Sequence, residues 1–474
     1  MSFLVVHSPY DTKRAYRTHP HHHAVYGPDG ISQTLLGQWL GVRQPHISRI
    51  ETGPPIRDLN TLVYWARVLK IPPRLLWFRM LEDKGQLVVA EPASGDLTPS
   101  ASRDVIELPT LRWASDLDEV RQSAVALWDC ALEDGRLADA ADTTTLSTFT
   151  LRWLVGSKDD AVFRRTGWPR VGLNDVMRLR AVRRQLKALD DAHGGGTAFP
   201  MAVTYLRREV APLHKGQYDD FTGRALFVAT AELKLDVGWM AYDAGNCELA
   251  WRYMIQALRL SHAVNNRLFG ARVLAAMSHQ ALHLRYVPLA VDLALAARKG
   301  TKSIAPPKAQ AMLAAMEACA HAADQRARPC VTALVEAETS LNRMGTDNDP
   351  DWLDFDQGGL SGHAARALRD LRQPGEAKSH AVASLAQCRA EHCRTRAQRN
   401  VILAMIQLQL GDIEAAAATG MLVVADAWRL HSSRVYSELA ALVRFIEASG
   451  STAVTEFVEQ ARELLAARQQ TTPA

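Results

Sequence analysis

Apolar residues recur at helical spacing along most of this chain, whereas the apolar–polar alternation typical of strands is scarce. The helical pattern is short and tight over residues 31–81 and is broken at 156–172. From about 201 to 470 it is almost continuous, with Ala and Leu as the dominant apolar residues. We therefore predict an all-α protein.

Changes in composition and clusters of helix-breaking residues divide the chain into segments. The stretch 82–104 mixes Gly, Ser, Pro and charged residues, which is typical of a linker. The predicted segments are an irregular, histidine-rich arm with a first helix (1–30), a compact helical head (31–81), this linker (82–104), a helical connecting region (105–225) and a helical-repeat region (226–470).

The head contains a pattern that predicts two short helices meeting at a sharp turn. Ser32 is a good N-cap for the first helix, and Gly41 tolerates the positive φ that a sharp turn requires. A second helix should begin near Gln44, because Pro45 suits a first helical turn. The apolar side chains expected beneath the turn are Leu36, Leu40, Val42, Ile47 and Ile50.

Polar side chains remain on the outer face of this second helix. They are Gln44, His46, Ser48 and Arg49. Glutamine can form paired hydrogen bonds with adenine, and arginine can do so with guanine, at the base edges in the major groove. The pattern therefore favours a recognition helix that enters the major groove of double-stranded DNA.

The segment resembles the helix-turn-helix of the Cro/phage-repressor (xenobiotic-response-element) family over about residues 31–80. The matching residues are Ser32-Gln33, Leu40-Gly41-Val42 and the run from Ile47 to Gly53. The resemblance implies that Gln33 contacts backbone phosphate, and that Leu59–Met80 supplies the closing helices of the domain. The residues it implies at the DNA surface, besides Gln33, are Thr34, Arg43, Gln44, Pro45, His46, Ser48 and Arg49.

Two residues depart from the usual family pattern. Gly37 stands where alanine is commoner, which should slightly weaken the first helix. Trp39 lies on a face that is often polar, where it would be buried or would pack on the following domain or on a partner protomer. Together with Pro45, Trp39 supports an alternative hypothesis, in which the protein is an interaction adaptor whose head has lost specific DNA binding.

Small residues recur at a fixed spacing in the C-terminal half, which predicts stacked helical pairs. Within each of five units, between about 227 and 440, the small positions are separated by 12 and then 7 residues. The five sets are Gly238, Ala250 and Ala257; Ser278, Ala290 and Ala297; Ala318, Cys330 and Ala337; Ala365, Ala377 and Ser384; and Ala404, Ala416 and Val423. Helices in a pair approach where side chains are smallest, and pairs must stack to bury their apolar faces.

This spacing resembles the tetratricopeptide repeat, and we predict an α-solenoid of such pairs behind the helix-turn-helix domain. The order of head, linker and repeats resembles a regulator type common in actinobacteria, a likeness also carried by residues 238–245 and 349–353. The resemblance implies a transcription regulator whose repeats bind a peptide, a small molecule or a protein as effector. We expect a homodimer that reads two half-sites, with oligomerisation mediated by the repeats; dimer contacts through the head are the alternative.

Charge is distributed in agreement with this hypothesis. The net charge of the whole chain is only +4, but residues 1–80 hold ten Lys/Arg against four Asp/Glu. The remainder of the chain holds 45 basic and 47 acidic residues. The basic excess therefore lies in the head, where contact with phosphate would require it.

No constellation of residues in the sequence indicates catalysis, a metal or a cofactor, so we expect a non-enzymatic protein. The histidines at 19 and 21–23 stand beside Pro20 in a segment expected to be flexible, which seldom holds ligands at the fixed geometry that a metal requires. The six cysteines form no CxxC pair. We interpret the run from His193 to Gly196 as a helix stop and the pair Asp190-Asp191 as a solvated face. The sequence shows neither a secretory pattern nor an apolar run of about 20 residues, so we expect a cytoplasmic protein without membrane contact.

Overall fold

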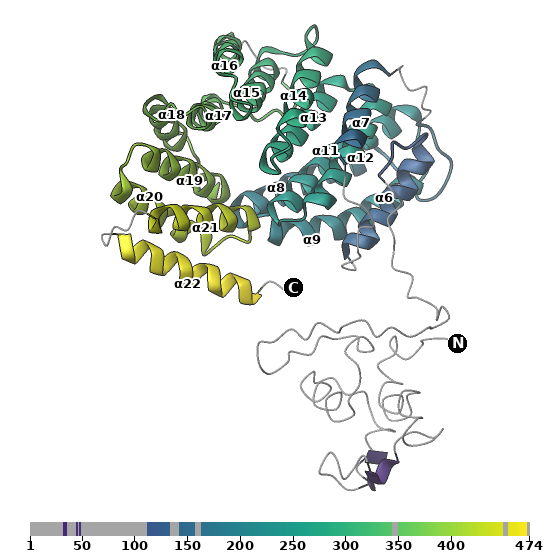
Figure 1. Cartoon of the computed structure of the whole chain (residues 1–474). Coiled ribbons are helices and arrows are strands. Elements are labelled where there is room, and N and C mark those ends of the chain that lie inside the picture. Colours follow the sequence, from purple (N-terminus) through teal and green to yellow (C-terminus); the bar gives the residue numbers. More distant parts are fainter. Residues whose placement is uncertain are drawn as a thin grey trace, which may run out of the picture. The chain divides into compact units, whose positions relative to one another are not determined.

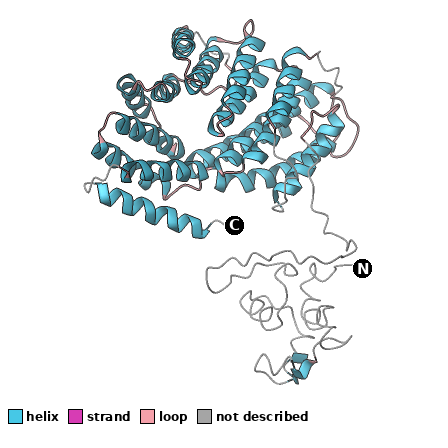
Figure 2. Cartoon of the chain, viewed as in Figure 1, coloured by secondary structure: helices cyan, strands magenta, loops and turns pink. Residues whose placement is uncertain are grey.

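The computed structural model of the chain describes residues 32–35, 44–45, 47–48, 111–132, 142–156, 163–343, 349–448 and 454–471. The chain divides into two units, Met1–Ser100 and Ala101–Ala474. In the described residues every regular element is helical, and extended pairing is limited to two isolated bridges (Figure 2). The all-α prediction is therefore confirmed for these residues, in which we also find no helix long and apolar enough to span a membrane.

The described helices of the second unit follow one another through short turns. In chain order they are α6 (Leu117–Leu132), α7 (Thr143–Val155), α8 (Leu173–His193), α9 (Gly195–Tyr205), the π-helical turn η3 (Leu206–Val210), α10 (Ala211–Lys215), α11 (Asp220–Asp243), α12 (Cys247–Ala263), α13 (Arg267–His283), α14 (Val287–Thr301), α15 (Pro307–Ala323), α16 (Ala327–Asn342), α17 (Gln357–Asp370), α18 (Pro374–Ala386), α19 (Cys393–Gln409), α20 (Ile413–Ala427), α21 (Ser433–Glu447) and α22 (Thr455–Thr471).

Consecutive helices from α11 to α20 pack as five pairs, in an arrangement consistent with a helical solenoid (Figure 1). The pairs are α11–α12, α13–α14, α15–α16, α17–α18 and α19–α20, and each pair also packs on the next. Helices α21 and α22 extend the stack at its C-terminal end. The five helical pairs predicted from the spacing of small residues are thus present in the described part of the chain.

The small residues lie where the two helices of a pair approach most closely. A Cβ added at Gly238 of α11 would lie 3.0 Å from Met254 Cγ and 3.4 Å from the carbonyl oxygen of Ala250 in α12. In the next pair, the Ser278 hydroxyl donates to the Ala290 carbonyl oxygen at 2.8 Å. The predicted offset of 12 residues therefore joins positions that face each other across a pair.

A residue with positive φ follows the first small position of each unit by seven residues. These turn residues are Gly245, Arg285, Gln325, Arg372 and Gly411. In the first turn the Asn246 N–H donates to the Ala241 carbonyl oxygen at 2.8 Å, a bond that closes a Schellman motif. The left-handed residue is what reverses the chain between the two helices of a pair.

Replacing the exposed Arg285 or Arg372 by glycine should raise the free energy of unfolding of the second unit. The left-handed conformation costs a residue with a Cβ about 1–2 kcal/mol, whereas the extra freedom of glycine in the unfolded chain offsets part of the gain. We expect a net gain of about 0.5–1 kcal/mol for each variant in denaturant unfolding. Gly411→Ala is the matched reverse change, because nothing lies within 4 Å of the added Cβ, and it should lower stability. Equal stability of all three variants and the native protein would contradict this account of the turns.

The connecting region joins the beginning of the solenoid to its end. Helix α8 packs on α11 and also on α19, and α21 contacts α11 (Figure 1). The predicted helix stop is confirmed, since α8 ends at His193 and Gly194 adopts φ 85°. The glycines that follow α8 let its end approach the backbone of His431 closely. The Gly196 N–H donates to the His431 carbonyl oxygen at 2.8 Å, and the His431 N–H donates to the His193 carbonyl oxygen at 2.7 Å.

The interpretation of Asp190-Asp191 as a solvated face was wrong. Asp190 and Asp191 are 3% and 8% exposed, and both bind Arg394 of α19. Arg394 Nη1 lies 2.8 Å from Asp190 and Nη2 lies 3.0 Å from Asp191, while Asp243 of α11 lies 3.9 Å from the same guanidinium. Lys187 Nζ completes the cluster at 2.8 Å from Asp191. Three carboxylates thus share two cations at the junction of α8, α11 and α19.

Candidate functional site

A pocket of about 580 Å³ lies where α6 of the connecting region meets the first helical pair. Its walls come from α6, α10, α11 and α12, together with Arg165 from the segment before α8. This volume is within the range of small-molecule sites, which is about 300–1,000 Å³. The lining is mainly apolar and includes three aromatic rings, those of Trp128, His214 and Phe227.

Lys234 of α11 is the cation buried at one end of this pocket. Its side chain is 1% exposed, and its Nζ donates to Gln256 Oε1 at 2.8 Å. The ammonium also lies 5.3 Å from the centre of the Trp128 ring, within the range of a cation–π contact. Burial lowers the pKa of Lys234 to about 7, because water is excluded from the charged form.

His214 of α10 lines the pocket and has an unpaired acceptor in its ring. Thr230 donates its hydroxyl hydrogen to the Leu226 carbonyl oxygen at 2.8 Å, so at 2.9 Å His214 Nε2 must be the donor to that hydroxyl. The other ring nitrogen, Nδ1, is then an acceptor, and it is buried without a hydrogen-bond partner. Burial lowers the pKa of His214 to about 3, with smaller contributions from nearby cations, the largest being Lys234.

Trp128 of α6 adds an unpaired donor. Its indole is 2% exposed, and its Nε1–H is buried without a hydrogen-bond partner. Trp128 therefore complements His214, since one side chain offers a donor and the other an acceptor. Buried polar groups of this kind are normally satisfied by protein, water or ligand.

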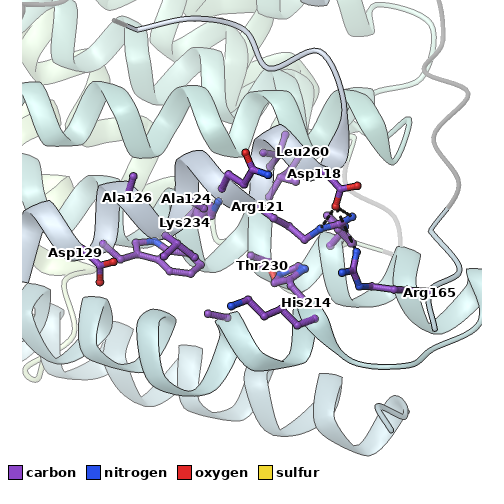
Figure 3. Close-up of a pocket in the computed structure, with 17 residues that line it drawn as sticks. Asp118, Arg121, Ala124, Ala126, Asp129, Arg165, His214, Thr230, Lys234 and Leu260 are labelled. Atoms are coloured by element: carbon purple, nitrogen blue, oxygen red, sulfur yellow. Dashed lines mark hydrogen bonds and ion pairs between the residues drawn. The ribbon is translucent and has the colours of Figure 1, made fainter. Parts of the chain in front are cut away.

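An ion-pair cluster closes the opposite end of the pocket. Asp118 Oδ1 binds Arg121 at 2.5 Å and Arg165 at 3.4 Å, and Figure 3 shows these three side chains together, away from Lys234. The hydrogen bond from Arg121, with its charge and that of Arg165, holds the pKa of Asp118 below its usual value. Asp129, the other carboxylate at the pocket, binds Arg207 of η3. Both acidic side chains are therefore already paired, whereas Lys234 has only an amide oxygen.

Five of the residues predicted to contact DNA lie among those that the structure describes. Gln33 and Thr34 are in a helical segment, as are Gln44, Pro45 and Ser48. The other three predicted contacts, Arg43, His46 and Arg49, lie outside the described residues.

The described head residues make a specific contact between the two predicted helix starts. Gln44 Nε2 donates to Gln33 Oε1 at 2.6 Å, and the Leu35 N–H donates to the Ser32 hydroxyl at 3.2 Å, as expected of an N-cap. Ile47 is fully buried, whereas Gln44 and Pro45 are exposed. The two predicted DNA-contacting glutamines are thus joined side chain to side chain.

The pocket residues were not predicted from the sequence. Lys234 gave a weak signal as a lysine between Leu233 and Leu235 in a helix that is buried along most of its length. Trp128 and His214 stand in separate segments with no shared spacing, so no motif connects them to Lys234.

No family model matches the chain, and no curated protein matches it significantly.

Three buried histidines should make the stability of the second unit fall in mild acid. His214, His279 and His363 have pKa values lowered by burial, with neighbouring arginines among the secondary causes. Each takes up a proton on unfolding below pH 6.5, so their stabilising contribution is present above 6.5 and is lost as pH falls toward the folded pKa. We expect each to contribute a loss of about 1 kcal/mol between pH 6.5 and 5.5, measured by denaturant unfolding.

The variant His363→Gln should flatten this fall. The buried Asp190 acts in the opposite sense, because burial raises its pKa to about 7 and its contribution therefore grows as pH falls from 7 toward 3.8. An identical pH profile for the native protein and His363→Gln would contradict the assignment.

Proposed function

We propose that this protein is a sequence-specific DNA-binding transcriptional regulator, and that its helical second unit receives an effector or partner. The observation that carries the proposal is the hydrogen bond between Gln33 and Gln44. It fixes the amide of Gln44, an exposed side chain of the predicted recognition helix, through Gln33, the predicted phosphate contact. A fixed amide loses less side-chain entropy when it binds a base edge.

The hydrogen-bonding capacity of this pair suits a DNA surface. Gln44 uses one N–H on Gln33, which leaves its carbonyl oxygen and a second N–H for adenine. The basic excess of residues 1–80 would supply the attraction to phosphate that is independent of sequence. We further propose that two copies of the chain bind two half-sites, which would match the symmetry of most regulators of this type.

Titrating the full chain with a random-sequence duplex at several salt concentrations tests whether the head meets phosphate. The logarithm of the affinity should fall linearly with the logarithm of salt concentration, by about 0.9 for each phosphate contact. Arg43→Ala should make this slope shallower by about one contact, whereas Arg372→Ala, a change in an exposed solenoid turn, should leave it unaltered. Absence of duplex binding at low salt would contradict the proposal and favour the adaptor hypothesis.

A further inference from the structure

The pocket between α6 and α11 contains buried polar groups that point to a ligand of particular chemistry. Three side chains in its wall are at least nine-tenths buried, and each has a polar group without the complementary group that would normally pair with it. Within the described part of the chain, Lys234 pairs with no carboxylate, Trp128 Nε1–H has no acceptor, and His214 Nδ1 has no donor. Buried polar groups are normally satisfied, and here an amine, an N–H donor and a ring acceptor belong to side chains that line one pocket of ligand size.

We propose that this pocket binds a small aromatic carboxylate that also bears a hydroxyl or N–H group, and that this ligand is the effector of the regulator. The carboxylate would bind the Lys234 ammonium and accept a hydrogen bond from the neighbouring Trp128 Nε1–H. The body of the ligand would lie among the aromatic and aliphatic side chains of the pocket. A hydroxyl or N–H of the ligand would donate to His214 Nδ1. That the ligand acts as an effector rests on the proposed regulatory function, whereas its binding does not.

Charge decides in favour of an anion over a neutral or cationic ligand. The pocket is lined by four basic residues and two acidic ones, and both acidic side chains are neutralised by arginines. Lys234 is buried and, among the described residues, Gln256 accepts its hydrogen bond, so a bound carboxylate would stabilise the protonated amine by supplying a negative charge. Charge-assisted hydrogen bonds of this type are about twice as strong as neutral ones.

The aromatic lining decides the shape of the ligand body. Trp128 lies beside Lys234, and the rings of His214 and Phe227 meet edge to face, with centres 4.6 Å apart. Phe227 also contacts Phe163, which lies behind it with ring centres 5.3 Å apart. These packed rings form a fixed wall against which a planar body can stack or meet edge to face.

The test uses three probes that share one body: 4′-hydroxybiphenyl-4-carboxylate, biphenyl-4-carboxylate and biphenyl-4-carboxamide. Isothermal titration of the full chain should show the hydroxylated carboxylate binding most tightly and the amide at least ten-fold more weakly than either acid. Lys234→Met should reduce carboxylate affinity at least ten-fold without changing amide affinity. Lys215→Met, which removes an exposed lysine at the same pocket, is the matched control and should change affinity less than three-fold.

A second variant keeps the test decisive if Lys234→Met does not fold. Trp128→Phe retains an aromatic ring but removes the indole N–H, and it should weaken binding of the carboxylates about three- to ten-fold. Equal binding of acid and amide, unchanged affinity in both variants, or no binding of any probe at millimolar concentration would overturn the site. If the carboxylates bind as expected but leave the DNA affinity unchanged, the site stands and its role as effector site fails. If the protein binds no DNA either with or without the carboxylates, the proposed function fails while the binding site stands.

Discussion

Replacing Arg394 by alanine is expected to lower the free energy of unfolding of the second unit by about 3–5 kcal/mol, the usual consequence of removing one partner from a buried ion pair. The side chain is 12% exposed and binds Asp190 and Asp191 at 2.8 and 3.0 Å. Without it, three carboxylates would remain near one lysine in a site from which water is largely excluded. Denaturant unfolding of the full chain, followed by far-UV circular dichroism, measures the loss.

Asp190→Asn provides the second half of this prediction. Burial raises the pKa of Asp190 to about 7, against the opposing charge of Arg394, and Asp243 and Asp191 raise it further. Its neutral amide should therefore be tolerated in the native protein and should recover at least about 1 kcal/mol of the loss in Arg394→Ala, a typical coupling energy within one network. The control is Arg178→Ala on α8. The Arg178 side chain is 62% exposed beside Asp175, so this substitution should change the free energy of unfolding by less than about 1 kcal/mol. Additive effects of the two substitutions would contradict the cluster as described.

The same cluster should hold the two ends of the solenoid together. Asp190 and Asp191 belong to the connecting region, Asp243 to the first helical pair and Arg394 to the last. Ser432, just before α21, also donates its hydroxyl to Asp243 at 2.8 Å. We therefore expect amide hydrogen exchange in Arg394→Ala to increase first in α8 and α19, ahead of the central pairs.

Replacing Gln44 by alanine is expected to weaken binding to the specific DNA site by about 1–3 kcal/mol, which is roughly 5- to 150-fold. The amide is exposed and is held by Gln33 at 2.6 Å, so the substitution would remove the proposed base contact without removing a buried side chain. Affinity for unrelated duplexes should stay within about two-fold, because phosphate contacts supply the non-specific term. Fluorescence anisotropy with matched specific and scrambled duplexes at one salt concentration makes the comparison.

Gln33→Ala separates the two roles assigned to this pair. It should weaken binding to both duplexes through the lost phosphate contact, and should also reduce specificity because Gln44 loses its support. Gln373→Ala, a change at an exposed glutamine of the solenoid, should leave both affinities unaltered. Equal losses on specific and scrambled DNA in Gln44→Ala would contradict base reading by this side chain.

The helical pairs could be predicted because their signal is local. Small residues 12 positions apart, such as Ser278 and Ala290, face each other whenever two helices are joined by a short turn. The turns themselves were only partly recognised. Glycine favours a positive φ, so Gly245 and Gly411 indicate a turn in the sequence. Arg285 and Arg372 occupy the equivalent position, but arginine does not indicate a positive φ. The local hydrogen bonds that end the first helix of each pair, Tyr286 N–H to the Ala281 carbonyl oxygen and Gln373 N–H to the Leu368 carbonyl oxygen, require that conformation.

A candidate site could be predicted from the sequence only where its residues lie close together along the chain. Gln33 and Gln44 are 11 residues apart and belong to one predicted motif, so the sequence pattern pointed to both, and a hydrogen bond joins them in the structure. Arg394 and Asp190 are 204 residues apart, and no periodicity connects them, which is why the aspartate pair was wrongly interpreted as solvated. The role of Lys234 was not predicted for a similar reason, since its contacts Trp128 and Gln256 lie on α6 and α12, far from it in the sequence.

Selection from a random duplex pool tests most directly whether the head reads DNA sequence. The native full-length protein and the double variant Gln44→Ala/Arg49→Ala would be compared at one stated salt concentration, since phosphate contacts make affinity steeply dependent on salt. We predict an enriched motif with two half-sites for the native protein, and loss of that motif in the variant. No enrichment by the native protein, or the same motif from both proteins, would contradict sequence-specific recognition by this helix.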